Sequence, residues 1–318
     1  MLRLASRGST LALWQAHHVQ ALLRSMHDDL DIDIEVLHTT GDIITDVPLA
    51  MIGDKGLFTK EVDAAVLDGR THAAVHSFKD VPTKLPDGLA LAAVMQREDP
   101  RDAFLPAPGR PRTLAELPAG ARVGTSSLRR RAILLSARPD LVVEDLRGNL
   151  NTRFRKLEEG AYDGILLALA GVRRFGREAE IGEVLDPPHW LPAAGQGALA
   201  IVARADDEET LRRLRPLDDE HTRAATTAER TFLARLEGGC QIPIGALATV
   251  SDSGLRLRGL VASLDGTTVV RGETGGTVAD AARAGEDLAD ELIGRGADAV
   301  LREVRAMSPR DVPDASAP

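Results

Sequence analysis

Short apolar runs rich in β-branched residues alternate along the chain with segments whose apolar residues recur every three or four positions. This alternation of strand and helix patterns is typical of α/β domains with largely parallel sheets. The first unit is predicted to contain strand 3–6, helix 9–26, strand 32–39, helix 59–67 and strand 73–77. The second unit is predicted to contain strand 121–124, helix 127–136, strand 141–145, helix 152–159, strand 164–168 and helix 170–175.

Two segments interrupt this alternation and are predicted to cross between the two units. Residues 96–102 are polar, contain a proline and follow an apolar strand, and residues 192–197 precede a predicted strand at 198–204. Two crossings between two α/β lobes place a cleft between the lobes, with hinge segments at both crossings. We expect the first lobe to span residues 1–97 and 198–215, and the second lobe residues 98–197.

The pattern changes beyond about Asp218. A predicted helix at 224–236 is followed by three strand-like runs and then by a long apolar-periodic segment, which predicts one helix over 278–304. We therefore expect a small α+β third domain over residues 216–308. Residues 309–318 are polar and rich in proline, and are expected to form a disordered tail.

Composition narrows the classes of function. The net charge of −9 argues against a nucleic-acid partner, because binding phosphates requires a basic surface. Arginines are nevertheless concentrated between residues 122 and 155, which favours a small polyanionic ligand. No apolar run approaches the roughly 20 residues that cross a bilayer, and the N-terminus lacks the apolar region of a signal peptide. We expect a soluble cytoplasmic protein.

The single cysteine, Cys240, lies in the sequence Leu-Glu-Gly-Gly-Cys-Gln-Ile-Pro. A lone cysteine forms no intramolecular disulfide, so Cys240 is a buried apolar residue, a metal ligand without partners, or a thiol with chemistry of its own. A predicted helix runs directly into the two glycines, and Pro243 stops a helix from continuing. This arrangement favours an exposed turn on which the sulfur acts as a nucleophile or an attachment point.

Polar residues follow the predicted strand 73–77. Ligands of open α/β sheets bind beyond the carboxyl ends of the strands, where Ser77, Lys79 and Asp80 are expected. A carboxylate beside a lysine stays ionised and can stabilise a cation or transfer a proton. An equally good alternative from spacing alone is a capped turn before Pro82.

Hydroxyl groups and arginines meet at two predicted helix N-termini of the second lobe. The first comprises Thr125, Ser126, Ser127, Arg129 and Arg130, and the second comprises Arg147, Gly148 and Arg153. Free backbone N–H groups and guanidinium groups make such corners anion sites. If the arginines serve binding, Arg130→Leu or Arg147→Leu should hardly change stability while activity drops steeply. The alternative is ordinary N-caps with the arginines on a solvated face.

A third strand-to-helix corner, in the first lobe, contains Arg7, Ser9 and Gln15, and Trp14 beside it is expected to be a core residue. The glycine-rich segment 53–58 lacks the spacing of a nucleotide-binding loop and is interpreted as a lid, with Phe58 covering the cleft. The run Gly195–Ala200 fits the dinucleotide fingerprint but precedes its strand, so that function is set aside. The eight histidines show no metal-ligand spacing, and no metal site is expected.

Seven motifs in order resemble the porphobilinogen deaminase (hydroxymethylbilane synthase) family of tetrapyrrole biosynthesis. The resemblance covers residues 3 to about 247 and continues more weakly through the third domain. The motifs are Ser9–Gln15, Lys55–Phe58, Val75–Pro82, Gly124–Arg130, Arg147–Arg153, Pro192–Gly197 and Glu237–Ile244. Met51 departs from the family, which often has lysine there.

The resemblance implies that Cys240 holds one dipyrromethane cofactor per chain through a thioether. Four porphobilinogen units would each lose ammonia and add head-to-tail, and hydrolysis would release linear hydroxymethylbilane. The implied catalytic residues are Asp80, Lys79 and Arg7. The implied cofactor contacts are Cys240, Ser77, Lys79, Asp80, Thr125, Ser126, Ser127, Arg129, Arg130, Arg147 and Gly148. The implied substrate contacts are Arg7, Ser9, Gln15, Phe58, Arg147, Arg153, Arg174 and Gln196.

Two other classes fit part of the pattern. Two α/β lobes with two crossings also describe periplasmic binding proteins, so the fold is expected to be periplasmic-binding-protein-like, and an anion-binding module without catalysis is the main alternative. That alternative leaves Cys240 on its glycine turn unexplained. A generic cysteine-nucleophile transferase would need a histidine base, and nothing in the sequence connects one to Cys240. We expect a monomer whose partner is the small-molecule substrate.

Overall fold

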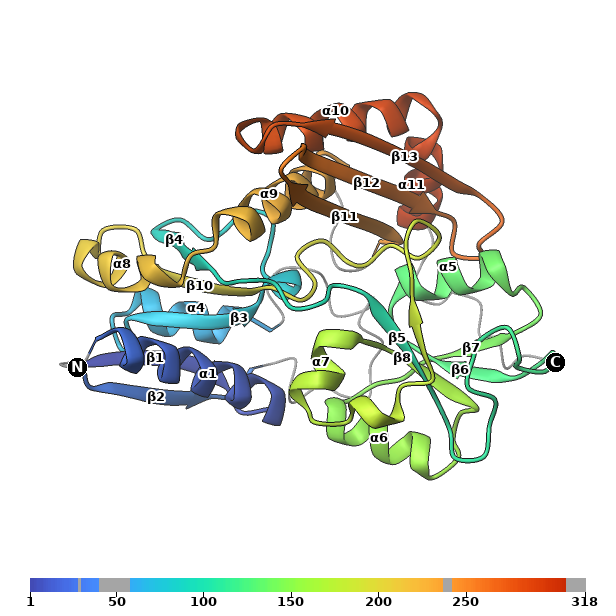
Figure 1. The fold of residues 1–318 in the computed structure, drawn as a ribbon, viewed down its shortest axis with the longest axis horizontal. Helices are drawn as coiled ribbons and strands as arrows, with labels where there is room; N and C mark the ends of the chain where they lie inside the picture. Colours follow the sequence, from blue (N-terminus) through green and yellow to red (C-terminus); the bar gives the residue numbers. More distant parts are fainter. Residues whose placement is uncertain (28–29, 40–57, 237–241, 307–318) are drawn as a thin grey trace.

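The computed structural model describes residues 1–27, 30–39, 58–236 and 242–306. Two five-stranded sheets with flanking helices form two α/β lobes, and a three-stranded sheet with helices forms a third domain above them (Figure 1). The predicted fold class, two α/β lobes joined by two crossings plus an α+β domain, is confirmed. The predicted lid segment 53–57, Met51, Cys240 and the tail 309–318 lie outside the described residues.

The first lobe has the strand order β2-β1-β3-β10-β4. Strands β1 to β3 are parallel, and β10 lies antiparallel between β3 and β4. The chain therefore leaves this sheet after β4 and returns to it with β10. The elements are β1 (Leu2–Arg7), α1 (Thr10–Met26), β2 (Ile32–Leu37), α4 (Lys60–Leu67), β3 (Ala73–Ser77), the 3-10 turn η1 (Phe78–Asp80), β4 (Leu89–Val94), β10 (Leu199–Arg204), α8 (Glu208–Leu214) and the 3-10 turn η3 (Arg215–Leu217).

The second lobe has the strand order β7-β6-β8-β5-β9. Strands β6, β7 and β8 are parallel, and β5 is antiparallel to both of its neighbours. The elements are β5 (Asp102–Pro106), β6 (Arg122–Gly124), α5 (Leu128–Ala137), β7 (Val142–Glu144), α6 (Leu150–Glu158), β8 (Gly164–Ala168), α7 (Leu169–Arg174), the 3-10 turn η2 (Glu178–Glu180) and β9 (Glu183–Leu185). Strand β5 begins at Asp102, which the sequence analysis included in the polar crossing segment.

The third domain is an antiparallel meander of β11 (Ile244–Ser251), β12 (Gly254–Ala262) and β13 (Val269–Gly276). Helix α9 (Glu220–Arg235) and α10 (Ala281–Gly294) pack on the sheet, around a core that includes Phe232 and Leu288. The prediction of one helix over 278–304 is wrong. The 3-10 turn η4 (Val278–Asp280) leads into α10, and α11 (Ala297–Ala306) begins only beyond Gly296. Gly296 has a φ of +99°, a left-handed backbone conformation that favours glycine and ends a helix.

Polar side chains begin the three helices that face the lobes' carboxyl edges. Ser9 accepts a hydrogen bond from the backbone N–H of Ala12 at the start of α1, and Ser127 does the same for Arg130 in α5. Asn149 caps α6, which starts at Leu150 and not at the predicted position 152. Each of these helices follows a parallel strand, so the caps bring three predicted motifs to the strand ends where α/β sheets bind ligands.

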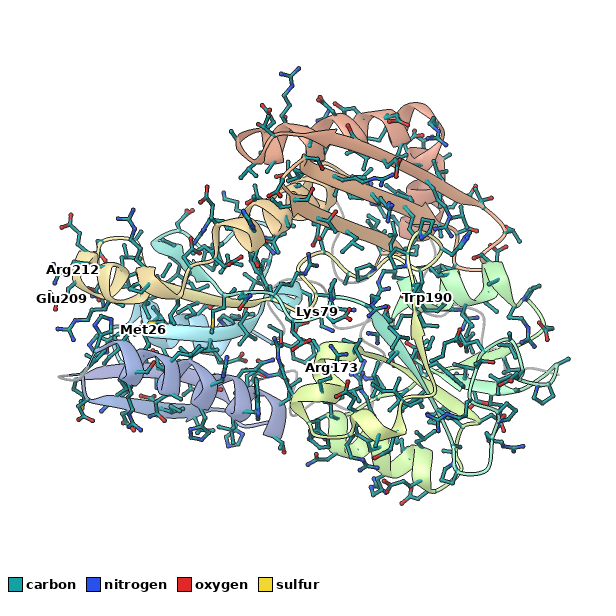
Figure 2. The ribbon with its side chains drawn as sticks, viewed as in Figure 1. Met26, Lys79, Arg173, Trp190, Glu209 and Arg212 are labelled. Carbon is teal, nitrogen blue, oxygen red and sulfur yellow. The ribbon has the colours of Figure 1, made fainter. Side chains whose placement is uncertain are left out.

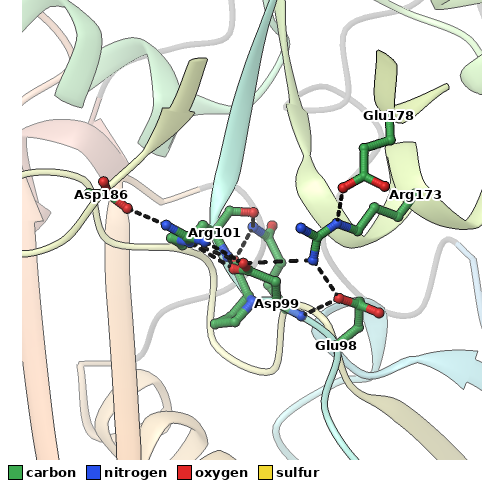
Figure 3. Close-up of polar contacts among 8 residues, drawn as sticks. Glu98, Asp99, Arg101, Arg173, Glu178 and Asp186 are labelled. Atoms are coloured by element: carbon green, nitrogen blue, oxygen red, sulfur yellow. Dashed lines mark hydrogen bonds and ion pairs between the residues drawn. The ribbon is translucent and has the colours of Figure 1, made fainter. Parts of the chain in front are cut away.

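Ion pairs fasten the first crossing to the second lobe (Figure 3). Arg101 Nη2 lies 2.6 Å from Asp99 Oδ2, and the same guanidinium pairs with Asp186 beyond β9. Arg173 of α7 reaches the crossing at Glu98, with 2.9 Å between Nη1 and Oε1. The crossing is thus a braced segment, with partly exposed charges on its surface.

The third domain packs on the second lobe through a shared core. Leu247 of β11 and Leu260 of β12 belong to the same buried cluster as Trp190 and Leu191 of the second lobe. Gly266, in the turn between β12 and β13, lies against the backbone of α5. The domain that contains position 240 is therefore fixed against the helix whose N-terminus carries Thr125 to Arg130.

Candidate active site

One cavity of the first lobe brings together six of the predicted site residues. Its lining includes Arg7, Ser9, Gln15, Phe58, Ser77 and Asp80. They come from the ends of β1 and β3, the first turns of α1, the segment before α4, and η1. Ser77 and Asp80 lie at the carboxyl end of β3, as predicted, and the lining also brings the Arg7 corner beside them, which the sequence analysis did not predict. We call it the first-lobe cavity.

Contacts inside the first-lobe cavity hold its polar groups in place. Gln15 is buried, and its Nε2 donates a hydrogen bond to Ser77 Oγ at 2.9 Å. The Arg7 guanidinium lies over the Phe58 ring, 4.4 Å from its centroid, as in a cation–π contact. Phe58 therefore contacts a predicted substrate-binding cation.

Lys79 lies where the two lobes meet, near the centre of the molecule (Figure 2). Its Nζ lies 3.4 Å from Gln196 Oε1, in the loop that leads back to the first lobe. Burial lowers the pKa of Lys79, Asp80 and Asp102 oppose this effect, and the charges of Arg130 and Arg129 add to it, so that the pKa is about 8. A lysine with this pKa holds its proton at neutral pH and loses it in mildly alkaline solution.

Asp102 is a functional candidate that the sequence analysis missed. Its carboxylate is fully buried and contacts both Arg129 and Arg130, each at 2.7 Å. Burial alone disfavours the ionised form, but the charges and hydrogen bonds of the two arginines hold the pKa of Asp102 well below its usual range. Its partners Arg129 and Arg130 are 27 and 28 positions away along the chain, so no local pattern connects them to Asp102. The only local signal was a polar residue in front of an apolar strand.

The alternative that placed Arg129 and Arg130 on a solvated face is wrong. The two residues are only 4% and 5% exposed. Arg129 also donates to the Leu191 carbonyl at 2.7 Å, and Arg130 to the Leu166 carbonyl at 3.0 Å. These arginines are part of the interior framework of the second lobe.

Positive charge accumulates on the second-lobe side. Burial and the charges of Arg130 and Arg147 together lower the pKa of Arg153 to about 10, while the charge of Asp80 opposes them. Arg153 Nε donates to the Gly148 carbonyl at 2.9 Å. The charges of Arg130, Arg147 and Asp80 therefore act on Arg153, so groups of both predicted anion corners and of η1 lie within electrostatic range of this residue.

The hydroxyl groups at the start of α5 have different surroundings. Thr125 Oγ1 accepts from the Ser127 backbone N–H at 3.2 Å, and Ser127 caps the helix. Ser126 Oγ is buried, with no hydrogen-bond partner among the residues that the structure describes. A buried hydroxyl of this kind suits a ligand that brings its own acceptor.

Arg174 and Trp14 bridge the lobes. Arg174 Nη2 donates to the Gly197 carbonyl at 2.7 Å, and its guanidinium lies 5.7 Å from the Trp14 ring centroid. The prediction that Trp14 is a core residue is wrong, because the side chain is 40% exposed and stacks on His18. Trp14 instead lies between the two lobes, where α1 contacts α7.

Comparison with known families decides the class of this site. Residues 2–212 match the family described as "Porphobilinogen deaminase, dipyromethane cofactor binding domain". Residues 224–294 match "Porphobilinogen deaminase, C-terminal domain". The chain belongs to the porphobilinogen deaminase family. It is a transferase that polymerises porphobilinogen in tetrapyrrole biosynthesis, as the resemblance of its motifs predicted.

Solved structures of periplasmic binding proteins resemble the fold at low similarity. An arginine-specific periplasmic binding protein of Salmonella typhimurium is 14% identical over 70% of this chain and 93% of its own, with a TM-score of 0.41. A nutrient-binding protein of Burkholderia cenocepacia bound to methionine is 12% identical over 67% and 90%, with a TM-score of 0.42. The BvgS VFT2 domain of Bordetella pertussis is 16% identical over 67% and 84%, with a TM-score of 0.41. The deaminase family match leaves the non-catalytic binding module without support.

The described residues suit a dipyrromethane. Each pyrrole of such a group carries an acetate and a propionate, so the ligand is a compact polyanion. Lys79, Arg147 and Arg153 provide cations, and the partnerless Ser126 hydroxyl provides a donor. Within the described ranges no group of three His, Cys, Asp or Glu side chains could hold a metal ion. None of the described helices is long and apolar enough to cross a membrane.

Arg130→Leu is expected to destabilise the fold. The prediction from sequence that this substitution would hardly change stability assumed a surface residue, and Arg130 is buried. Removing one partner of a buried ion pair leaves charge uncompensated, and Arg129 offsets only part of it, so we expect a loss of about 3 kcal/mol. Urea unfolding measures this loss. Arg155→Leu, on the exposed side of α6, is the matched control and should change stability by less than about 0.5 kcal/mol. Equal, small effects of the two substitutions would contradict the framework role of Arg130.

Proposed function

We propose that this transferase joins four porphobilinogen molecules head-to-tail on one dipyrromethane per chain, which is attached to Cys240 through a thioether, and releases linear hydroxymethylbilane. The observation that carries the proposal is the placement of Asp80 in the first-lobe cavity, within electrostatic range of Lys79 and Arg153. A carboxylate within a set of buried cations suits a reaction in which a cation forms on a substrate covered with carboxylates.

The proposed roles follow from the position of each group. Asp80 stabilises the positive charge that develops when porphobilinogen loses ammonia, and holds pyrrole N–H groups by accepting hydrogen bonds. Lys79 assists as a charged donor, and Arg7, which lines the same cavity as Asp80, orients the substrate. When bound, the dipyrromethane supplies the pyrrole carbon that attacks the incoming unit.

The remaining contacts divide between the two lobes. Cofactor carboxylates are proposed to bind at the α5 and α6 corners, through Thr125, Ser126, Ser127, Arg129, Arg130, Arg147 and Gly148, with Ser77, Lys79 and Asp80 opposite. Arg129 and Arg130 already pair with Asp102 in the interior of the second lobe, so binding of cofactor carboxylates would be a second role for these two arginines. Substrate carboxylates are proposed to bind Arg7, Ser9, Gln15, Phe58, Arg147, Arg153, Arg174 and Gln196.

We propose lobe boundaries of 1–97 with 198–215 and 98–197, and a cofactor-carrying domain of 216–308. Strand β10 in the first sheet and the bracing of the first crossing support these boundaries. We further propose a cytoplasmic monomer that binds no nucleic acid, which the net charge of −9 supports.

Turnover should decline in alkaline solution as Lys79 loses its proton. Its pKa is about 8 in the chain itself, and bound carboxylates raise that value, so the decline of kcat/KM is expected at or somewhat above pH 8. Lys79→Arg keeps the charge at all these pH values and should move the decline upward. The exposed Lys84→Arg is the control and should leave the profile unchanged. An unchanged profile in Lys79→Arg would remove Lys79 from the proposed catalytic set.

Incubation of the purified chain with porphobilinogen alone tests the proposed function. We expect ammonia release, and one linear tetrapyrrole for four porphobilinogen consumed. Binding of porphobilinogen without release of ammonia would overturn the proposal in favour of a binding module.

A further inference from the structure

Asp102 is the centre of a buried polar cluster that no role described above explains. Besides Arg129 and Arg130, its carboxylate accepts hydrogen bonds from Trp190 Nε1 and Gln196 Nε2, each at 2.8 Å. Asp102 and Gln196 are 0% and 1% exposed. We call these five residues the Asp102 cluster.

The cluster fixes the orientation of the Gln196 amide. Its Nε2 donates to Asp102 Oδ1 at 2.8 Å and to the Pro100 carbonyl at 2.7 Å. Both of those partners are acceptors, so the NH₂ end must face them. The other end, Oε1, is left facing Lys79 Nζ at 3.4 Å, where it can only accept.

This arrangement connects the two lobes. Asp102 begins β5 of the second lobe, Lys79 lies in η1 of the first, and Gln196 belongs to the loop that returns the chain from one to the other. A single buried carboxylate thus contacts the arginines of the α5 corner directly and reaches Lys79 through one amide. Among the described residues, the charges of Asp80, Arg130, Asp102 and Arg129 act on Lys79.

We propose that Asp102 is a positioning residue. Through Gln196 it keeps the Lys79 ammonium charged and directed toward the site, and through its ion pair it fixes the position of Arg130 relative to Lys79. The inference rests on the proposed role of Lys79. Two buried arginines beside Lys79 would otherwise repel its charge, and Asp102 supplies the opposing negative charge. A purely structural carboxylate would stabilise the fold without affecting the Lys79 proton.

The direct test is the titration of Lys79 in Asp102→Asn, which keeps the shape of the side chain and removes its charge. The chain has only five lysines, Lys55, Lys60, Lys79, Lys84 and Lys156, so ¹³C-methylated lysine NMR can follow each one, with Lys79→Arg assigning the signal. We expect the Lys79 midpoint to fall by about one pH unit. Repeating the pair in a Cys240→Ser background excludes a difference in attached cofactor as the cause.

Asp99→Asn is the matched control. It removes a carboxylate of the same crossing segment that pairs with Arg101 and Arg173 (Figure 3). Among the residues that the structure describes, no hydrogen bond or ion pair joins Asp99 to Gln196 or Arg130. The Lys79 midpoint should stay at its original value there. An unchanged midpoint in Asp102→Asn, or an equal fall in Asp99→Asn, would overturn the inference.

Gln196→Met provides a second test if Asp102→Asn does not fold. It keeps every charge but removes the amide, so the Lys79 midpoint should fall by less than in Asp102→Asn. No change would overturn the role of Gln196 as the connection. These titrations need no turnover, so they test the connection between Asp102 and Lys79 independently of the proposed function. A wild-type protein without an attached dipyrromethane would contradict the proposed function but would not change the expected titrations.

Discussion

Asp80→Asn is expected to lower the rate of a single turnover about a hundredfold or more. The amide keeps the size and hydrogen-bonding capacity of Asp80 but removes the charge that stabilises a cation in a partly desolvated cavity, which is worth several kcal/mol at the transition state. Binding of porphobilinogen should change much less, because we propose that arginines hold the substrate carboxylates. Rapid-quench kinetics on cofactor-loaded protein measure both quantities.

Asp87→Asn is the control for this experiment. Asp87 is exposed beyond the Lys79–Asp80 turn, and its substitution should leave the rate unchanged. If Asp80 only caps its turn, an asparagine serves nearly as well, since both side chains accept a backbone hydrogen bond. A single-turnover rate within a few-fold of wild type in Asp80→Asn would therefore assign Asp80 to the turn and not to catalysis.

Cys240→Ser is expected to abolish turnover. The oxygen of serine is a much weaker nucleophile than a thiolate at neutral pH, so no stable cofactor should form. The substitution changes one atom, and the thermal unfolding midpoint should stay close to that of wild type before cofactor loading. The Ehrlich colour reaction detects attached pyrroles and should be negative.

Restoring a cofactor by another route separates attachment from folding. Cys240→Ser incubated with preformed oligopyrrole should remain unlabelled after denaturation, whereas wild type retains its pyrroles. A normal colour reaction with full turnover in Cys240→Ser would show that the attachment point lies elsewhere.

Local patterns predicted most of the elements. The buried strand at 73–77 and the helix beginning after Ser9 agree with the structure, because a short apolar run and an N-cap are local signals. The position of Ser77 and Asp80 beyond the end of a strand followed from the rule that α/β sheets bind ligands at that edge, whereas the approach of Arg7 to them was not predicted.

The interior position of the second-lobe arginines could not be predicted in this way. Their burial depends on Asp102, and on Trp190 and Gln196 about 90 residues further along the chain, so no local pattern records it. The break at Gly296 was missed for the opposite reason. Apolar periodicity continued through it, and the left-handed backbone of one glycine overrode that periodicity.

The central claim is that Cys240 carries a dipyrromethane, and intact mass spectrometry of the purified chain tests it most directly. The account predicts a mass above that of the sequence by two condensed pyrrole units, located by peptide mapping on the peptide that contains Cys240. The same preparation of Cys240→Ser should show the mass of its sequence alone. An unmodified wild-type mass in protein that turns over porphobilinogen, or an adduct on any other residue, would contradict the account.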